Sequence, residues 1–217
     1  MAQRTVHAMF GVLLRDRLEL TDSGRFLLGS ILPDSYADPG QRQTSHFIKS
    51  AGDEGFLYFD FHDFLESFNE RVMTDELYLG YYAHLVEDAI YRYFLYYEKG
   101  WMQKLKSYKL DILHKDYAIL NSYVVRRYPL PCRIVLPEGF DAEPLHRITK
   151  FDAEALICKY ENDLLASDSG TLEMLTEDVL EEFAAKYVDI LTDELRAVRR
   201  GRSLLNAADY RWERKNA

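Results

Sequence analysis

One predicted helix, over residues 74–98, places two ionisable side chains where a helical core requires apolar ones. Leu, Ala, Val and Ile at positions 79, 83, 86 and 90 predict burial over much of its circumference. A buried carboxylate is costly unless it is paired or binds a metal ion. The helix therefore predicts either a His84–Asp88 ion pair in the core or two ligands that converge on one ion. The residues that share its inward stripe, spaced alternately by four and three, are Leu77, Tyr81, His84, Asp88, Tyr91 and Leu95.

The rest of the chain repeats the helical pattern. Apolar stripes predict further helices over about residues 5–18, 23–31, 56–72, 102–127, 151–166 and 174–199. Thr74 is the predicted N-cap of the central helix and Gly100 its end. Residues 34–55 are predicted to form mostly loop.

A proline-rich connection over about residues 128–148 separates two parts of this pattern, with a short extended piece predicted over 132–136. Connections of this length are often functional. The whole pattern predicts an all-α, single-domain multi-helix bundle over residues 1–217. Its metal-site core would span about residues 5–128, and its C-terminal helices about 151–199.

Composition limits the function classes. With 217 residues and 47% hydrophobic content, the chain can bury a sizeable core. A formal net charge of -9 disfavours nucleic acid and anionic membrane surfaces as partners. The N-terminus has no apolar signal region, so we expect a cytoplasmic protein without stable membrane association. Cys132 and Cys158 form no Cys-x-x-Cys pair, which argues against a cysteine zinc site or a disulfide framework.

Three further residues are candidate metal ligands. His7 lies on the inward stripe of the first helix, Asp34 follows Pro33 at the end of the second, and His46 lies in the following loop. Each alone is ordinarily a core histidine, a turn residue or a loop residue. Together with His84 and Asp88 they form a nitrogen and oxygen ligand set that suits zinc, with manganese or iron as alternatives.

The order of these elements resembles the zinc-dependent phospholipase C family over about residues 5–95. The motifs that carry the resemblance are His7, Leu32-Pro33-Asp34, Ser45-His46-Phe47 and His84-x-x-x-Asp88. The resemblance implies a phospholipase C-like helical fold in which Asp34, His46 and His84 hold one ion. It further implies that His7 belongs to a second ion and that Asp88 bridges the two. Asp34 would also be the candidate catalytic base.

The chain departs from that family at the remaining ligands. Secreted members begin with a tryptophan whose amino terminus binds metal, and no tryptophan stands near His7. The family's histidine shortly after the bridging aspartate is missing, and Phe94 stands six residues after Asp88. The only His-x-x-x-Glu, His62 to Glu66, lies upstream on a polar face and is predicted to be an exposed pair. We therefore expect a divergent bacterial, cytoplasmic member with one or two ions.

Two other residues are weaker candidates. Asp116 intrudes on the inward stripe of the helix predicted over 102–127. It could be an additional ligand, hold a liganding histidine in place, or accept a core hydrogen bond from a tyrosine. Arg42 is close to His46 in sequence and could contact a substrate phosphate, although a solvated loop arginine is the simpler interpretation.

The residues favour a metal-dependent hydrolase that acts on a small phosphoester, with Asp34 orienting or deprotonating the attacking water. One alternative is an HD-type phosphohydrolase, but such enzymes carry adjacent His and Asp ligands. The only pair of that kind here, His62-Asp63, falls on a polar face. An alternative from another class is a non-catalytic helical protein that keeps a structural metal or only a buried His–Asp pair.

Overall fold

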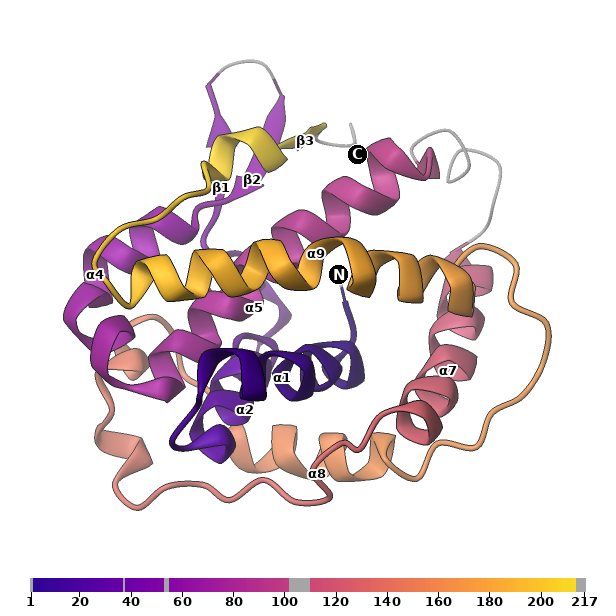
Figure 1. The fold of residues 1–217 in the computed structure, drawn as a ribbon, viewed down its shortest axis with the longest axis horizontal. Helices are drawn as coiled ribbons and strands as arrows, with labels where there is room; N and C mark the ends of the chain where they lie inside the picture. Colours follow the sequence, from indigo (N-terminus) through magenta and orange to yellow (C-terminus); the bar gives the residue numbers. More distant parts are fainter. Residues whose placement is uncertain (1, 37, 53–54, 102–109, 214–217) are drawn as a thin grey trace.

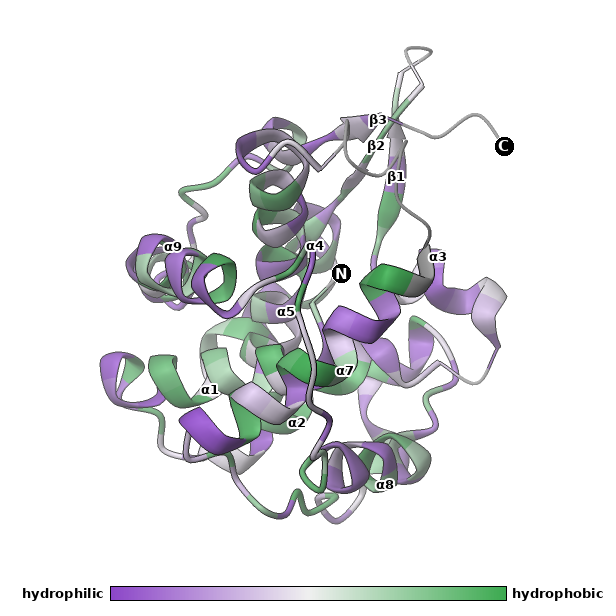
Figure 2. Ribbon diagram, turned by 90° about the vertical axis from the view of Figure 1, so that its right-hand side faces the viewer, coloured by the Kyte–Doolittle hydropathy of each residue, from purple (hydrophilic) through white to green (hydrophobic). Residues whose placement is uncertain are grey.

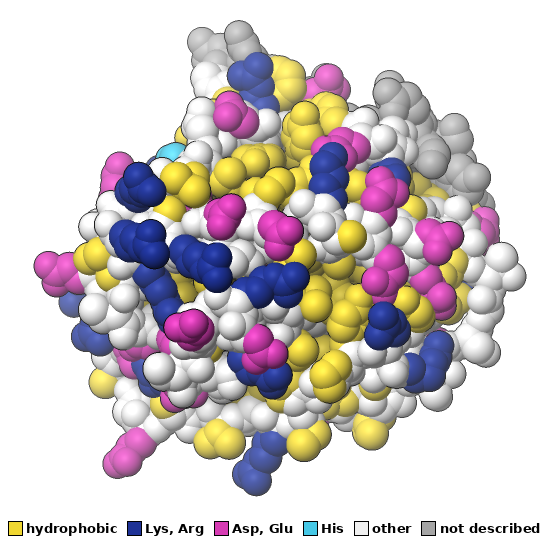
Figure 3. Space-filling model, in the orientation of Figure 1, with side chains coloured by type: hydrophobic (Ala, Val, Ile, Leu, Met, Phe, Trp, Pro, Cys, Tyr) yellow, Lys and Arg dark blue, Asp and Glu magenta, His cyan; other side chains and the backbone are white. Residues whose placement is uncertain are grey.

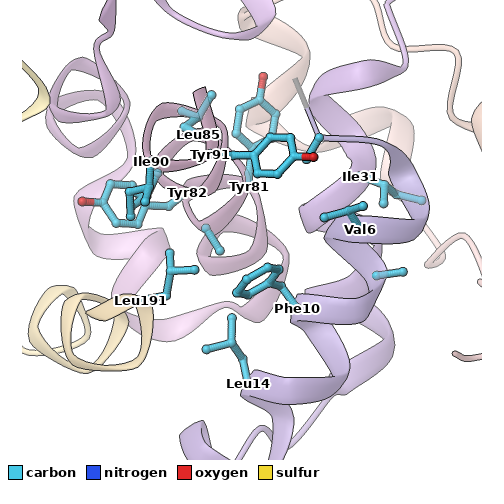
Figure 4. Packing of buried hydrophobic residues seen from close by; sticks show 14 of the residues in the cluster. Val6, Phe10, Leu14, Ile31, Tyr81, Tyr82, Leu85, Ile90, Tyr91 and Leu191 are labelled. Carbon is cyan, nitrogen blue, oxygen red and sulfur yellow. The ribbon is translucent and has the colours of Figure 1, made fainter. Parts of the chain in front are cut away.

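Helix α5 (Glu76–Tyr93) is the centre of the molecule. The computed structural model describes residues 2–36, 38–52, 55–101 and 110–213, and it buries every α5 side chain from Glu76 to Tyr91. Figure 1 shows α9 (Glu177–Val198) crossing in front of α5, with α1 (Arg4–Leu18) and α2 (Ser23–Ile31) below. Apolar side chains from all of these helices converge on α5 (Figure 4). The predicted helical bundle is thus confirmed in its coarse form.

The other helices surround this centre. They are α3 (Arg42–Ser45), α4 (Phe61–Thr74), α7 (Leu110–Arg127) and α8 (Ala153–Asp163), and α5 continues into a π-helical turn, η3 (Phe94–Glu98). The predictions for α1, α2, α8 and α9 agree closely with these bounds. The part of the predicted 102–127 helix that precedes Leu110 lies outside the described residues.

A small antiparallel sheet corrects the all-α prediction. Strand β1 (Ile48–Ala51) pairs with β2 (Phe56–Phe59), which pairs in turn with β3 (Trp212–Glu213) near the end of the chain. The prediction of a helix over 56–72 is therefore wrong for its first four residues, and the predicted loop over 34–55 contains both α3 and β1. Helix α4 begins only after Asp60, whose carboxylate accepts a bond from the Asp63 N–H at 3.3 Å.

Two further boundaries differ from the predictions. Thr74 is the last residue of α4, and its hydroxyl donates to the Glu70 carbonyl at 2.8 Å. The N-cap of α5 is instead Asp75, which accepts from the Leu77 N–H at 3.0 Å. Residues 132–136 form no strand; the proline-rich connection contains the 3-10 turns η4 (Phe140–Ala142) and η5 (Pro144–Arg147).

Helices α2 and α5 cross at two glycines. A Cβ atom on Gly29 would lie 2.0 Å from the Leu77 carbonyl oxygen, and one on Gly80 would lie 2.1 Å from the Phe26 carbonyl oxygen. Both distances are far below van der Waals contact, so this approach of two backbones requires glycine on each side. In Figure 2, much of the ribbon of α1 and α2 is coloured as hydrophobic. As a result, the backbone of α2 comes within hydrogen-bonding reach of α5 side chains.

The surface carries charges of both signs. Figure 3 shows lysine and arginine side chains gathered over the C-terminal end of α9. Helix α9 has Glu177 and Asp178 in its first turn and Arg196 in its last, which complements the helix dipole. Among the described helices, none combines the length and the apolar character that a membrane crossing requires.

Candidate metal centre

Four of the five predicted ligands surround one point between α2, α3 and α5. The Nε2 atoms of His46 and His84 lie 3.2 Å apart, and Asp34 Oδ1 lies 3.3 Å from His46 Nε2. Asp88 Oδ2 lies 3.8 Å from each of these two nitrogens. The chain brings these residues together from helix α5, from the short turn η1 (Leu32–Asp34), and from the residue that follows α3.

The fifth predicted ligand, His7 of α1, lies beside this group. Its ring stacks on that of His84 with centroids 3.9 Å apart, and its Nε2 lies 3.7 Å from Asp88 Oδ1. The two oxygens of Asp88 thus face different histidines. Candidate ligand atoms fall into two overlapping groups, His7–Asp34–His84 and His46–His84–Asp88, each with its atoms within 4.8 Å of one another.

His46 and His84 direct Nε2 into the cluster because their Nδ1 atoms contact other groups. Nδ1 of His84 contacts the Ser30 carbonyl at 2.7 Å, and Nδ1 of His46 contacts the Arg42 carbonyl at 3.1 Å. A carbonyl can only accept, so Nδ1 of His84 carries the proton and its Nε2 presents a lone pair. Nδ1 of His46 also lies 2.8 Å from the Ser45 hydroxyl, which can donate or accept, so its contacts allow either tautomer. With His46 in the tautomer that donates to the Arg42 carbonyl, the Nε2 lone pairs of His46 and His84 face each other 3.2 Å apart. That arrangement is repulsive unless a cation or a proton lies between them.

These separations fit a zinc ion. A tetrahedral site with zinc–nitrogen and zinc–oxygen bonds of about 2.0–2.2 Å places neighbouring ligand atoms about 3.3 Å apart. The distances from His46 Nε2 to His84 Nε2 and to Asp34 Oδ1, 3.2 and 3.3 Å, match that value. The distances to Asp88 Oδ2, 3.8 Å, need only a small side-chain adjustment.

Two buried atoms of the cluster also indicate a cation. Asp88 Oδ2 and His7 Nε2 have no hydrogen-bond partner among the described residues, and both side chains are fully buried. An unpaired buried polar group costs about 1–3 kcal/mol, and more when it is charged. The other oxygen of Asp88 accepts from the Ala2 backbone N–H at 3.0 Å. A cation held with His46 and His84 would satisfy Asp88 Oδ2, whereas His7 belongs to the other group of candidate ligand atoms.

The charges of the cluster are strongly coupled. Burial, together with the charge of His7, lowers the pKa of His84 to about 3, so this ring is neutral. Burial acts to raise the pKa of Asp34 and of Asp88, but the neighbouring histidines hold both below their usual range. Both carboxylates are therefore ionised at neutral pH. The cluster offers lone pairs and negative charge, which is the donor set that a divalent metal requires.

The loop that carries His46 is fixed by the central helix. Tyr81, one turn before His84, donates its hydroxyl to the Ser45 carbonyl at 2.5 Å. Phe47 adopts a left-handed conformation, with φ 50°, and its ring packs on Phe64 at 5.6 Å. A non-glycine residue in this region is strained and persists only where the surroundings hold it. The turn at Phe47 and the bond from Tyr81 together keep the His46 ring directed inward.

Sequence reasoning missed Glu87. This carboxylate is buried and places Oε2 3.1 Å from His7 Nδ1. Burial would lower the pKa of His7, but Glu87 and Asp88 raise it to about 9. A carboxylate on the second nitrogen is the usual partner of a metal-binding histidine. A signal for it was present in the sequence, because any charged residue between Leu79 and Tyr91 of this wholly buried helix had to be buried too.

Asp116 lies outside the cluster, which corrects its interpretation as a ligand or as a support for one. Its carboxylate accepts the backbone N–H groups of Glu173, Met174 and Leu175, at distances of 2.6 to 3.2 Å. This residue therefore fixes the segment before α9. The partners of Asp116 are thus backbone N–H groups, and not the tyrosine hydroxyl that the sequence also allowed.

Arg42 adjoins the ligands through its backbone carbonyl, which contacts His46, whereas the His62-Asp63 pair lies apart from them. Arg42 also lines a hollow with Gln43, Ile48 and Leu57, and Asp34 is not among the residues that line that hollow. His62 is half-buried rather than exposed, and its Nε2 contacts the Leu205 carbonyl at 2.8 Å instead of pairing with Glu66. Asp63 pairs with Lys49 at 2.7 Å.

Comparisons with models of known protein families, with curated proteins and with solved structures found no significant match to this chain. The functional argument therefore rests on the geometry of the cluster.

Proposed function

We propose that this protein is a metal-dependent hydrolase of a phosphoester. His7, Asp34, His46, His84 and Asp88 would hold one or two divalent ions, with zinc the first choice and manganese or iron the alternatives. The observation that carries the proposal is the convergence of three histidine Nε2 atoms and two ionised carboxylates in one buried cluster. In a metal site the second nitrogen of each histidine ordinarily meets a carboxylate or a carbonyl, as it does here for His7 and His84.

The resemblance to the zinc-dependent phospholipase C family adds support for a phospholipase C-like fold. The five candidate ligands that the resemblance names come together in space. The position where the family has a further histidine is occupied by Phe94, whose ring packs 5.4 Å from that of Phe183 in the core. This packing favours one or two ions over three.

When bound, such an ion would lower the pKa of a water molecule to about 7 and polarise a phosphoryl oxygen. Asp34 is suited to orient that water, because its side chain is 14% exposed while His46, His84 and Asp88 are fully buried. The histidines hold the pKa of Asp34 below its usual range, so it accepts a hydrogen bond well but takes up a proton poorly. We therefore assign Asp34 the role of positioning the water.

A cleft at Asp34 favours the enzyme over a purely structural metal protein. Structural zinc sites are closed, whereas catalytic sites keep a position open to substrate. Here a cleft of about 530 Å³ reaches Asp34 and the Ala2 backbone beside Asp88. The HD-type alternative has less support, because His62 and Asp63 bond to other partners outside the cluster.

The hydrolase proposal is tested by assaying the protein with phenyl phosphate and with bis-p-nitrophenyl phosphate, before and after metal removal. We expect hydrolysis of at least one ester, loss of activity with a chelator, and recovery on addition of zinc. Stoichiometric metal without hydrolysis of any phosphate ester would support the structural alternative. Activity that survives complete metal removal would contradict the proposal directly.

Zinc binding is expected to release a proton from His7. Because Glu87 keeps the pKa of His7 near 9, the ring is protonated at pH 7.5 in the metal-free protein. Zinc affinity should therefore rise with pH until about 9, as competition from this proton disappears. Glu87→Gln removes a charge that raises the pKa of His7, so burial should lower that pKa. Zinc binding to this variant should then release one proton fewer than zinc binding to the wild type. Calorimetric titration of zinc in buffers of different ionisation enthalpy counts these protons; equal counts for both proteins would contradict the prediction.

A further inference from the structure

The cleft at Asp34 has walls that bear hydrogen-bond donors. It measures about 530 Å³, within the range of about 300–1,000 Å³ that small-ligand sites occupy. Arg4 begins α1, Asn121 lies on α7 and Lys159 lies on α8, and all three line the cleft with Asp34. Helix α1 contacts both α7 and α8, so these side chains belong to one packed unit.

One of the two cations in the cleft forms no ion pair with the residues that the structure describes. Arg4 pairs with Asp163 at 2.8 Å, so these two residues neutralise each other. Lys159 is exposed and forms no ion pair with any residue that the structure describes. The side chain of Asn121 accepts from the Thr5 hydroxyl through Oδ1, which leaves its NH₂ group as a donor for a ligand. Besides the carboxylates of Asp34 and Asp163, the cleft therefore offers hydrogen-bond donors and the positive charge of Lys159.

We propose that this cleft binds a small phosphoester that carries a second anionic group, which contacts Lys159 and Asn121 while its phosphate lies at Asp34. This assignment rests on the proposed hydrolase function. The lining of the cleft also favours water-soluble substrates over lipids. A cleft lined by Arg4, Lys159 and Asn121 suits a charged, water-soluble molecule, and it lacks the apolar lining that an acyl chain would need.

Two phosphonates that differ only in a carboxylate test this inference without requiring turnover. The probes are phenylphosphonate and 4-phosphonobenzoate, titrated calorimetrically into the zinc-loaded protein. We expect 4-phosphonobenzoate to bind about fivefold more tightly, as for one favourable, partly exposed charge pair. Lys159→Gln should abolish this preference and leave the affinity for phenylphosphonate unchanged.

Lys150→Gln is the matched control, because Lys150 is an exposed lysine that does not line the cleft. It should retain the preference for the carboxylate. Equal affinities of the wild type for the two phosphonates, or a preference that survives Lys159→Gln, would overturn the assignment of the cleft. Either result would leave the proposed hydrolase function standing. If the protein holds no metal after exposure to zinc, the proposed function falls and this inference falls with it, so metal content is measured first.

Discussion

Replacing Gly80 by alanine is expected to lower the free energy of unfolding by about 3 kcal/mol, the upper end of the usual cost of overpacking. The added Cβ would lie 2.1 Å from the Phe26 carbonyl oxygen and 2.9 Å from the Ser30 backbone nitrogen. Both atoms belong to the backbone of α2, so no side-chain rotation relieves the contact. Helix α2 must move as a unit, in the most buried part of the fold.

The same substitution should weaken metal binding. Helix α2 carries the Ser30 carbonyl, which accepts the proton of His84 Nδ1 and so fixes which nitrogen faces the cluster. Loss of such a supporting bond commonly costs about 10–100-fold in metal affinity. Gly80→Ala thus couples a packing defect to the candidate site, although Gly80 is not itself a ligand.

Gly11→Ala is the matched control for Gly80→Ala. Gly11 also lies buried inside a helix, but a Cβ there would meet only Leu27 Cδ1, at the ordinary distance of 3.7 Å. Alanine should stabilise this position by about 0.5–1 kcal/mol through its higher helix propensity. Denaturant unfolding measures both variants. Similar stability changes in the two would contradict the close-packed crossing of α2 and α5.

Replacing His84 by alanine is expected to reduce zinc affinity by at least about hundredfold. Removal of a residue that merely supports a ligand already costs about 10–100-fold, and His84 offers its Nε2 to both groups of candidate ligand atoms. Zinc at a hundred times its dissociation constant should stabilise the wild type by about 2.7 kcal/mol. The variant should show little of that gain.

Competition with a chromophoric chelator measures the affinity of the His84→Ala variant, and thermal unfolding with and without zinc measures the gain in stability. His114→Ala is the control, because His114 is exposed on α7 and belongs to neither ligand group. It should bind zinc as the wild type does. Unchanged zinc affinity in His84→Ala would remove this histidine from the site.

Local pattern was sufficient to predict most helices and the candidate ligands. Helices α1 and α2 have clear apolar stripes. His84 and Asp88 stand out because polar residues are unexpected in a helix that is buried on all sides. The sequence order of His7, Asp34 and His46 added the remaining candidates. Their proximity in space follows from the way α1, α2 and α3 pack around α5.

Long-range contacts were not predictable in the same way. The segment Phe56–Phe59 continues the apolar spacing of α4, yet it forms a strand because Ile48–Ala51 and Trp212–Glu213 lie on either side of it. Asp116 resembled Asp88 in its position on a stripe, but its partners are backbone N–H groups far along the chain. A helical stripe identifies which residue is buried and leaves its partner undetermined.

Metal content is the measurement that tests the central claim most directly. The protein is purified without chelators, exposed to zinc, dialysed and analysed for divalent metals by elemental mass spectrometry, beside His84→Ala. The geometry of His7, Asp34, His46, His84 and Asp88 predicts one or two ions per chain in the wild type and a clear loss in the variant. A wild-type protein that retains no stoichiometric metal would contradict the account and leave a buried ion-pair network in its place.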